Sequence, residues 1–109
     1  MRFCPWYALD EVDRHAPAGR GVFQVRVPAG LLVYPTGQSA MVHYELADDV
    51  RAAAAAFAGS HRGRGWLCRH TIEMTAHDEE QLADFHARLL RDFRVRFGAA
   101  PHLPDGAAA

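Results

Sequence analysis

Lysine is absent from this chain of 109 residues, and cysteine and long apolar runs are scarce. The twelve basic residues, all arginine, nearly balance thirteen acidic residues, so the formal net charge is −1. The chain therefore lacks the overall basicity that is typical of nucleic-acid-binding proteins. Two cysteines do not make a disulfide framework. No apolar run approaches the ~20 residues needed to span a membrane, and no signal-peptide pattern is present. These absences predict a cytoplasmic protein with free thiols and no membrane partner.

Half of the residues are hydrophobic, which is enough for one compact core without crosslinks. Residues 1–20 are expected to form a lead-in segment, which Pro17 and Gly19 separate from the first strand. Residues 21–104 then form a single α+β domain. The final residues, 105–109, end in alanines and are expected to be a disordered tail.

Alternation of apolar and polar residues predicts strands over residues 21–27, 31–36 and 66–75. The loop Pro28-Ala29-Gly30 joins the first two, and a three-residue loop ending in glycine is typical of a hairpin. Residues 37–47 fit two interpretations. Their apolar residues Met41, Val42 and Tyr44 suit either a short additional strand or a packed loop.

Two helices follow from propensity and capping signals. An alanine-rich run after Asp48 or Asp49 predicts a helix that ends at Gly59. Asp78 and Gln81 approximate a capping box and predict a second helix of about 20 residues, which ends at Gly98. The order β-β-α-β-α predicts a small mixed three-stranded sheet flanked by helices.

Several short runs carry a family resemblance. They are Gly21-Val22-Phe23, Val33-Tyr34-Pro35-Thr36-Gly37, Ser39, Arg51 and the stretch from Phe93 to Pro101. With the element order, they resemble the GIY-YIG nuclease superfamily over roughly residues 17–104. Members of that family cut DNA phosphodiesters with an activated water and one divalent metal. The resemblance implies that Tyr34 acts at the reaction centre and that Arg51 faces the phosphate, with Mg²⁺ or Mn²⁺ as the cofactor.

Three positions depart from the family pattern. Phe23 replaces the first motif tyrosine, and two residues instead of one separate Tyr34 from Gly37. His86 occupies the position of the metal-binding glutamate, and a neutral imidazole does not replace a carboxylate for Mg²⁺. We therefore expect a non-catalytic binding or assembly module without a cofactor, as an accessory subunit of a larger complex or a homo-oligomer. The alternative is a divergent DNA endonuclease of GIY-YIG type, in which Asp84 or Glu80 takes the metal.

In the binding interpretation, His70, His86 and Ser39 join Tyr34 and Arg51 as candidates for lining the cleft. His70 and His86 both fall on inward faces of their elements, so they are expected to meet between sheet and helix. With Cys68 they would also suit zinc, although hydrogen-bonded packing histidines are the favoured interpretation. Tyr34 has two interpretations: it either packs at the end of a strand or takes part in the binding cleft. The expected partner is a protein or a second copy, and the Arg62-Gly63-Arg64 loop leaves nucleic acid possible.

Overall fold

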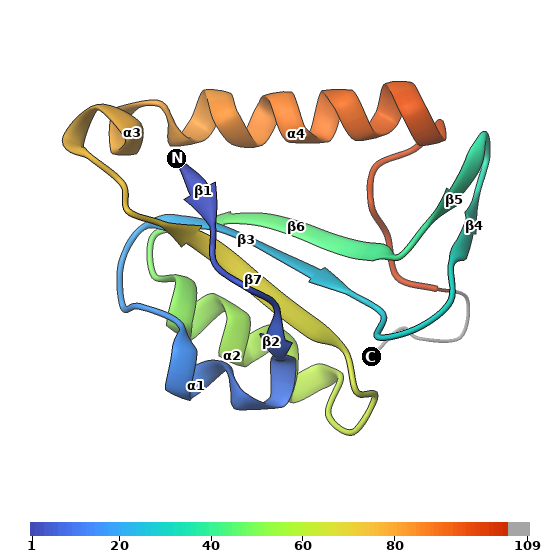
Figure 1. Ribbon diagram of the computed structural model, residues 1–109, viewed down its shortest axis with the longest axis horizontal. Coiled ribbons are helices and arrows are strands. Elements are labelled where there is room, and N and C mark those ends of the chain that lie inside the picture. Colours follow the sequence, from blue (N-terminus) through green and yellow to red (C-terminus); the bar gives the residue numbers. More distant parts are fainter. Residues whose placement is uncertain (105–109) are drawn as a thin grey trace.

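The computed structural model describes residues 1–104, so the tail predicted at 105–109 lies outside the described residues. The fold has three layers, with a β-sheet between helices on both of its faces (Figure 1). Helix α4 (Leu82–Phe97) covers one face, and α1 (Val12–His15) and α2 (Val50–Ser60) cover the other. A short 3-10 helix, η1 (Leu9–Glu11), precedes α1. The predicted α+β class is confirmed. No described helix combines the length and the hydropathy needed to cross a bilayer.

The main sheet is larger than predicted. It has five strands, in the order β1 (Arg2–Phe3), β7 (Leu67–Ile72), β3 (Gly21–Arg26) and β6 (Met41–Ala47), with β2 (Tyr7–Ala8) also paired to β7. All strand pairs in the described chain are antiparallel, so the expectation of a mixed three-stranded sheet was wrong. The extra strands come from residues 1–20, which run along β7 as part of the domain instead of leading into it.

The predicted hairpin also has a different second strand. Strand β3 pairs with β6, from Gly21 opposite Ala47 to Arg26 opposite Met41. Residues 32–34 form β4 (Leu32–Tyr34), which pairs with β5 (Gly37–Ser39) in a separate ribbon that projects beside the end of α4 (Figure 1). Proline at the second and glycine at the fourth position favour a tight turn over residues 34–37, so this segment folds back on itself. The seven residues of β6 then give β3 a longer ladder.

The main core lies between the sheet and helices α1 and α2. Its buried members include Leu9, Val12, Phe23, Val25, Val50, Ala54, Ala58, Trp66 and Cys68. At Gly21 a side chain would not fit, because a Cβ there would lie 2.8 Å from Thr71 Oγ1 and 3.1 Å from Val50 Cγ2. Helix α2 begins as predicted, with Asp49 accepting a hydrogen bond from the Ala52 N–H, but it runs past Gly59 to Ser60.

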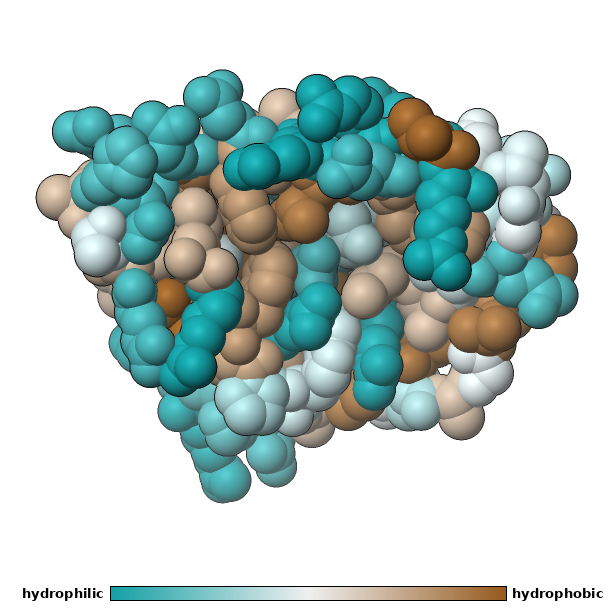
Figure 2. Space-filling view, turned by 45° about the horizontal axis from the view of Figure 1, so that its top comes forward, coloured by the Kyte–Doolittle hydropathy of each residue, from teal (hydrophilic) through white to brown (hydrophobic). Residues whose placement is uncertain are grey.

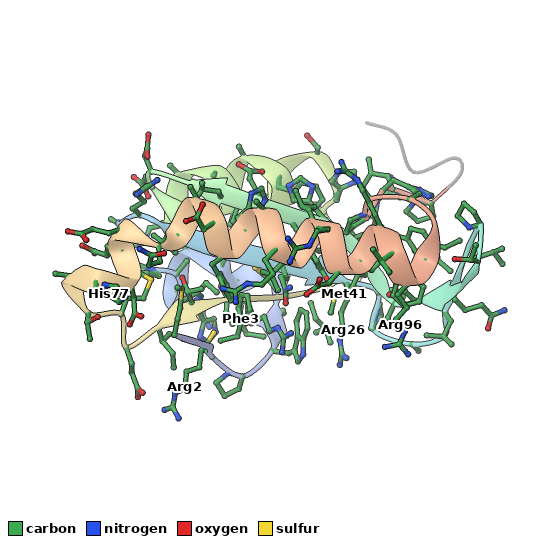
Figure 3. All side chains as sticks on the ribbon, turned by 90° about the horizontal axis from the view of Figure 1, so that it is seen from above. Arg2, Phe3, Arg26, Met41, His77 and Arg96 are labelled. Carbon is green, nitrogen blue, oxygen red and sulfur yellow. The ribbon has the colours of Figure 1, made fainter. Side chains whose placement is uncertain are left out.

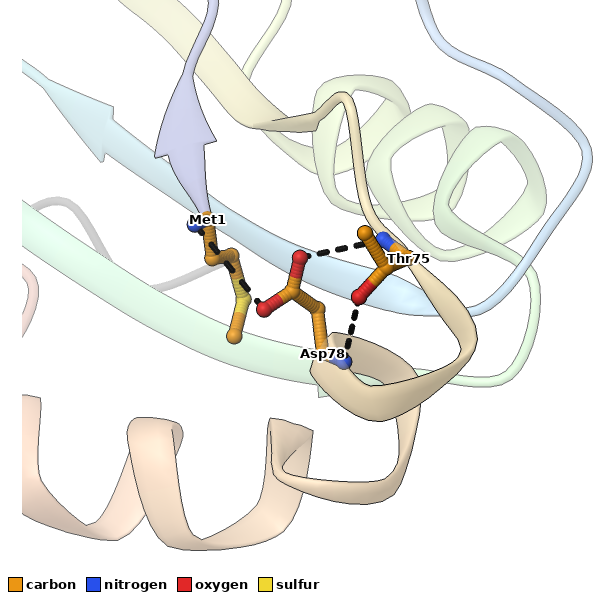
Figure 4. Close-up of polar contacts among 3 residues, drawn as sticks. All are labelled: Met1, Thr75 and Asp78. Carbon is orange, nitrogen blue, oxygen red and sulfur yellow. Dashed lines mark hydrogen bonds and ion pairs between the residues drawn. The ribbon is translucent and has the colours of Figure 1, made fainter.

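The single long helix predicted after Asp78 is two helices, α3 (Ala76–Glu80) and α4, with a break at Gln81. The capping box is one turn earlier than expected. Thr75 Oγ1 accepts from the Asp78 N–H at 3.1 Å, and Asp78 Oδ2 accepts from the Thr75 N–H at 3.0 Å (Figure 4). The Thr75 N–H bond lowers the pKa of Asp78, whose second oxygen lies 4.0 Å from the Met1 ammonium. Helix α4 ends as predicted at Gly98, where φ is 80°.

Helix α4 packs its apolar stripe on the sheet through Leu82 and Phe93, which are both buried. Hydrophilic side chains gather over its outer surface (Figure 2). Val95 departs from this pattern, because 81% of its surface is exposed. The face of the sheet under α4 is opposite to the face that carries the main core, which decides which predicted site residues can meet.

Candidate binding cleft

The five predicted site residues lie in three separate parts of the structure. Tyr34 and Ser39 belong to the β4–β5 ribbon, Arg51 and His70 lie on the α1/α2 side of the sheet, and His86 lies on α4. Of these residues, Arg51 and His70 line the same pocket. The five therefore do not form one site.

Tyr34 is 3% exposed, and its hydroxyl is engaged in internal contacts. It donates a hydrogen bond to the Met41 carbonyl at 2.6 Å and accepts one from the His102 N–H at 3.2 Å. Its ring meets the Phe93 ring edge-on, with centroids 5.1 Å apart. Burial raises the pKa of Tyr34, so the phenol stays protonated at neutral pH. These contacts hold the ribbon against α4 and the segment that follows it. Ser39, which is 8% exposed, accepts from the Met41 N–H nearby.

The expected meeting of His70 and His86 does not occur. His70 lies opposite Phe23 in the sheet, on the face that packs on α1 and α2, whereas His86 lies on α4 over the other face. The sequence places both on inward faces, but those faces belong to two different interfaces. Within residues 1–104, no group of three or more His, Cys, Asp or Glu side chains is placed to hold a metal ion. The zinc alternative with Cys68 therefore has no ligand set in the described residues.

Two adjoining pockets lie where the N-terminal segment runs along β7. The first, of about 350 Å³, is lined by Cys4, Pro5, Trp6, Tyr7, His15 and His70. The second, of about 380 Å³, is lined by His15 to Pro17, Arg51, His70 to Met74 and Glu79. His15 and His70 line both pockets, so we treat the two as one cleft. Its size falls within the range of small-ligand sites.

His70 is the centre of this cleft and is 5% exposed. Its Nδ1 lies 2.8 Å from the Tyr7 hydroxyl and 3.6 Å from Cys4 Sγ. Burial, and then the nearby charge of His15, lower the pKa of His70, so its imidazole is neutral at pH 7. Burial is also the main cause that raises the pKa of Tyr7. Both groups are therefore neutral at pH 7, and a single hydrogen bond joins the Tyr7 hydroxyl to Nδ1.

Neighbouring rings and cations fix the walls of the cleft. The Tyr7 ring stacks on His15 with centroids 4.4 Å apart. Trp6 has the guanidinium of Arg26 within 4.6 Å of its ring and that of Arg69 within 4.4 Å. Such cation–π contacts stabilise an aromatic side chain that would otherwise move freely at the surface.

Arg51 supplies positive charge at the other end of the cleft. Its Nε donates to the Ala16 carbonyl at 2.7 Å. Among the described residues, the Arg51 side chain makes no other hydrogen bond. The terminal N–H groups of the guanidinium are thus left for a ligand. Glu73 lines the same pocket, but its carboxylate is paired with Arg2 at 2.7 Å.

The arrangement suits binding of a ligand that has an apolar or aromatic group beside an anionic one. Cys68 does not supply a nucleophile, because burial raises the pKa of its thiol to about 11. Sequence reasoning missed Cys4, Tyr7 and His15, since they lie in the predicted lead-in. Only the pairing of β1 and β2 with β7 brings them beside His70. The sequence carries no local signal for that pairing, because each strand has two residues.

Comparison of the chain with protein-family models, with curated proteins and with solved structures finds no match. The function must therefore be inferred from the cleft.

Proposed function

We propose that this chain is a non-catalytic binding or assembly module on a GIY-YIG-like fold, with a protein or a second copy as its partner. One observation carries the proposal: Arg51 and His70 line an open cleft, while the hydroxyl of Tyr34 is taken up by packing contacts. A nuclease of this type would need Tyr34 free to act in acid–base chemistry.

The element order supports the fold assignment in the proposal. Strands β3 and β6, helix α2, strand β7 and helix α4 follow one another in the β-β-α-β-α order of the resemblance, once β6 takes the place of the second strand. The β4–β5 ribbon is then an extension of this hairpin, and it carries Tyr34 away from the sheet.

The lining of the cleft indicates the chemistry of its ligand. Trp6 and Tyr7 offer apolar surface, His70 offers a neutral imidazole, and Arg51 offers a guanidinium that suits a carboxylate. An aromatic residue with a nearby carboxylate, as at the end of a peptide chain, has both features.

The binding experiment uses N-acetylphenylalanine as the probe, followed by two-dimensional ¹H–¹⁵N NMR on the labelled full chain. We expect saturable shifts at His15, His70 and Arg51, with millimolar affinity. N-acetylphenylalanine amide, which lacks the carboxylate, should bind about tenfold more weakly, and Arg51→Ala should remove this difference. Arg62→Ala, at an exposed loop arginine, is the matched control and should leave the tenfold difference between the two probes unchanged. Shifts that avoid the cleft, or no saturable shifts at all, would count against the proposal.

The non-catalytic part is tested with supercoiled plasmid and either Mg²⁺ or Mn²⁺. We expect no strand cleavage by the purified wild-type chain. Metal-dependent nicking that Arg51→Ala abolishes would establish the endonuclease instead, with Mg²⁺ or Mn²⁺ as its cofactor.

A further inference from the structure

Strand β6 is the last strand of the main sheet, and its outer edge has no partner strand among the described residues. It is seven residues long and contains no proline, lysine or arginine. Natural proteins protect long edge strands with such residues, since an open edge offers its N–H and C=O groups to another chain. At the start of the strand, the Met41 carbonyl accepts from the Tyr34 hydroxyl and the Met41 N–H donates to Ser39 Oγ; within residues 1–104 no other backbone group of β6 is bonded to a side chain. The edge is thus open where most strands of this length are protected.

The polar side chains along β6 are self-complementary about Tyr44. His43 precedes Tyr44, Glu45 follows it, and the two flanking pairs on either side, Met41-Val42 and Leu46-Ala47, are apolar. In an antiparallel pair of two copies with Tyr44 opposite itself, His43 of each copy lies directly opposite Glu45 of the other. An imidazole can donate a hydrogen bond to a carboxylate directly opposite it, and such cross-strand pairs stabilise a sheet; here the pair occurs twice.

His43 and Glu45 are hydrogen-bonded to each other within the single chain, beside the open edge. They lie on the same face of the sheet, with His43 Nε2 at 2.7 Å from Glu45 Oε1. Their side chains are 28% and 38% exposed, so both are accessible from the edge. The Phe57 ring stacks on His43 with centroids 4.3 Å apart, which fixes the imidazole beside the edge.

Helix α4 has one side toward β1 and the opposite side toward the β6 edge. Phe85 contacts Phe3 on the β1 side of the sheet, and Phe3, Arg26 and Arg96 lie along that same side of α4 (Figure 3). Helical spacing then places Ala83, Ala87, Leu90 and Arg94 on the opposite side, toward the β6 edge.

Helix α2 is arranged similarly on the other face. Phe57 marks its β6 side, and Ala53 and Ala56 flank Phe57 there. With strands ~4.8 Å apart, helices centred between β3 and β6 would lie ~10 Å from their copies across the joint, which is an ordinary packing distance. On α2, the alanine side chains allow that approach.

We propose that two copies of this chain associate edge to edge through β6, across a twofold axis at Tyr44, so that their sheets become continuous. This inference rests on the assembly part of the proposed function. The cleft lies at the β1/β2 edge of the sheet, so it remains open in the dimer.

The experiment measures mass against concentration for the full chain, by sedimentation equilibrium and by light scattering after gel filtration. The wild type should reach twice the 12.1 kDa of one chain. H43E places carboxylates at both positions 43 and 45, and E45K leaves the joint without a carboxylate acceptor, so each variant alone should dimerise at least tenfold more weakly. The double variant H43E/E45K reverses the polarity of the pair and should dimerise again.

Mixing the two single variants gives the sharpest result. H43E repels its own copy and E45K offers its own copy no acceptor, but each complements the other, so an equimolar mixture should form a heterodimer that neither component forms alone. This outcome also shows that the variants are folded. E80K, a charge reversal at an exposed position of α3, is the matched control and should dimerise like the wild type.

Three results would overturn the inference: a monomer at every concentration, a dimer that ignores all of these charge changes, or a stable complex only with a different protein through this edge. A monomer that still binds N-acetylphenylalanine in the cleft would overturn the dimer alone and leave ligand binding standing. A dimer that does not bind N-acetylphenylalanine would overturn ligand binding in the cleft and leave the dimer standing.

Discussion

Replacing Tyr34 by phenylalanine separates a structural role of this residue from a catalytic one. The substitution keeps the ring contact with Phe93 and removes only the hydroxyl. It therefore loses the hydrogen bond to the Met41 carbonyl and the one from the His102 N–H. Each such bond contributes about 1 kcal/mol net, and a group left without a partner in a buried position costs more. We expect Y34F to lower the free energy of unfolding by about 2 kcal/mol.

Urea denaturation followed by tryptophan fluorescence measures this loss. At a slope of about 2 kcal/mol/M, the midpoint should fall by roughly 1 M. In a thermal scan, the same loss lowers Tm by roughly 8–16 °C for a chain of this size.

The matched control is Tyr44→Phe. Tyr44 also packs edge-on against Phe93, at 5.6 Å, and burial raises its pKa to about 12, so both phenols are protonated at pH 7. Its hydroxyl makes no hydrogen bond within the described residues, so Y44F should cost less than about 0.5 kcal/mol. If Y34F is as stable as Y44F, the hydroxyl does not hold the ribbon, and the structural account of Tyr34 is wrong.

Three further changes test other parts of the structure. Gly21→Ala should cost about 1–3 kcal/mol in urea denaturation because its Cβ would meet Thr71, whereas Gly19→Ala, with open space around it, should be nearly neutral. Burial lowers the pKa of His61, so the unfolded chain takes up the proton first and folding stability is lost as pH falls below about 6.5. His61→Phe should therefore lose less folding stability than the wild type between pH 7.5 and 5.5. An equal loss in the two proteins would contradict this account. At pH 8 a disulfide reagent should titrate the half-exposed Cys4 rapidly and Cys68 only in urea, and two fast thiols would show that Cys68 is not shielded.

Local signals in the sequence were enough for most of the helices and for the strands with clear alternation. The alternating residues of β3, the N-cap of α2 and the terminal Gly98 of α4 each act within a few residues, and the structure has them close to where they were expected. The turn of the β4–β5 ribbon at Pro35-Thr36 also has a local signal, the proline and glycine of a tight turn. The apolar residues before it instead favoured one continuous strand over residues 31–36.

The partners of those elements were not determined locally. Strand β3 pairs with β6 and not with the nearer residues 31–36, because ladder length and burial across the whole sheet decide pairing. For the same reason, inward positions such as His70 and His86 do not indicate which interface they face. The two strands of the N-terminal segment are stable only because β7 is already in place beside them.

The sequence by itself therefore determined the α+β class and the positions of the main helices and strands, and it named Arg51 and His70 among the candidates for a site. Only the tertiary structure decided that these two residues share a cleft with Tyr7 and His15, that Tyr34 is a packing residue, and that β6 is left at an open edge. The physical reason is the distance along the chain over which each effect acts. Propensity and capping depend on neighbours along the chain, whereas a site depends on which distant segments the sheet and the core bring together.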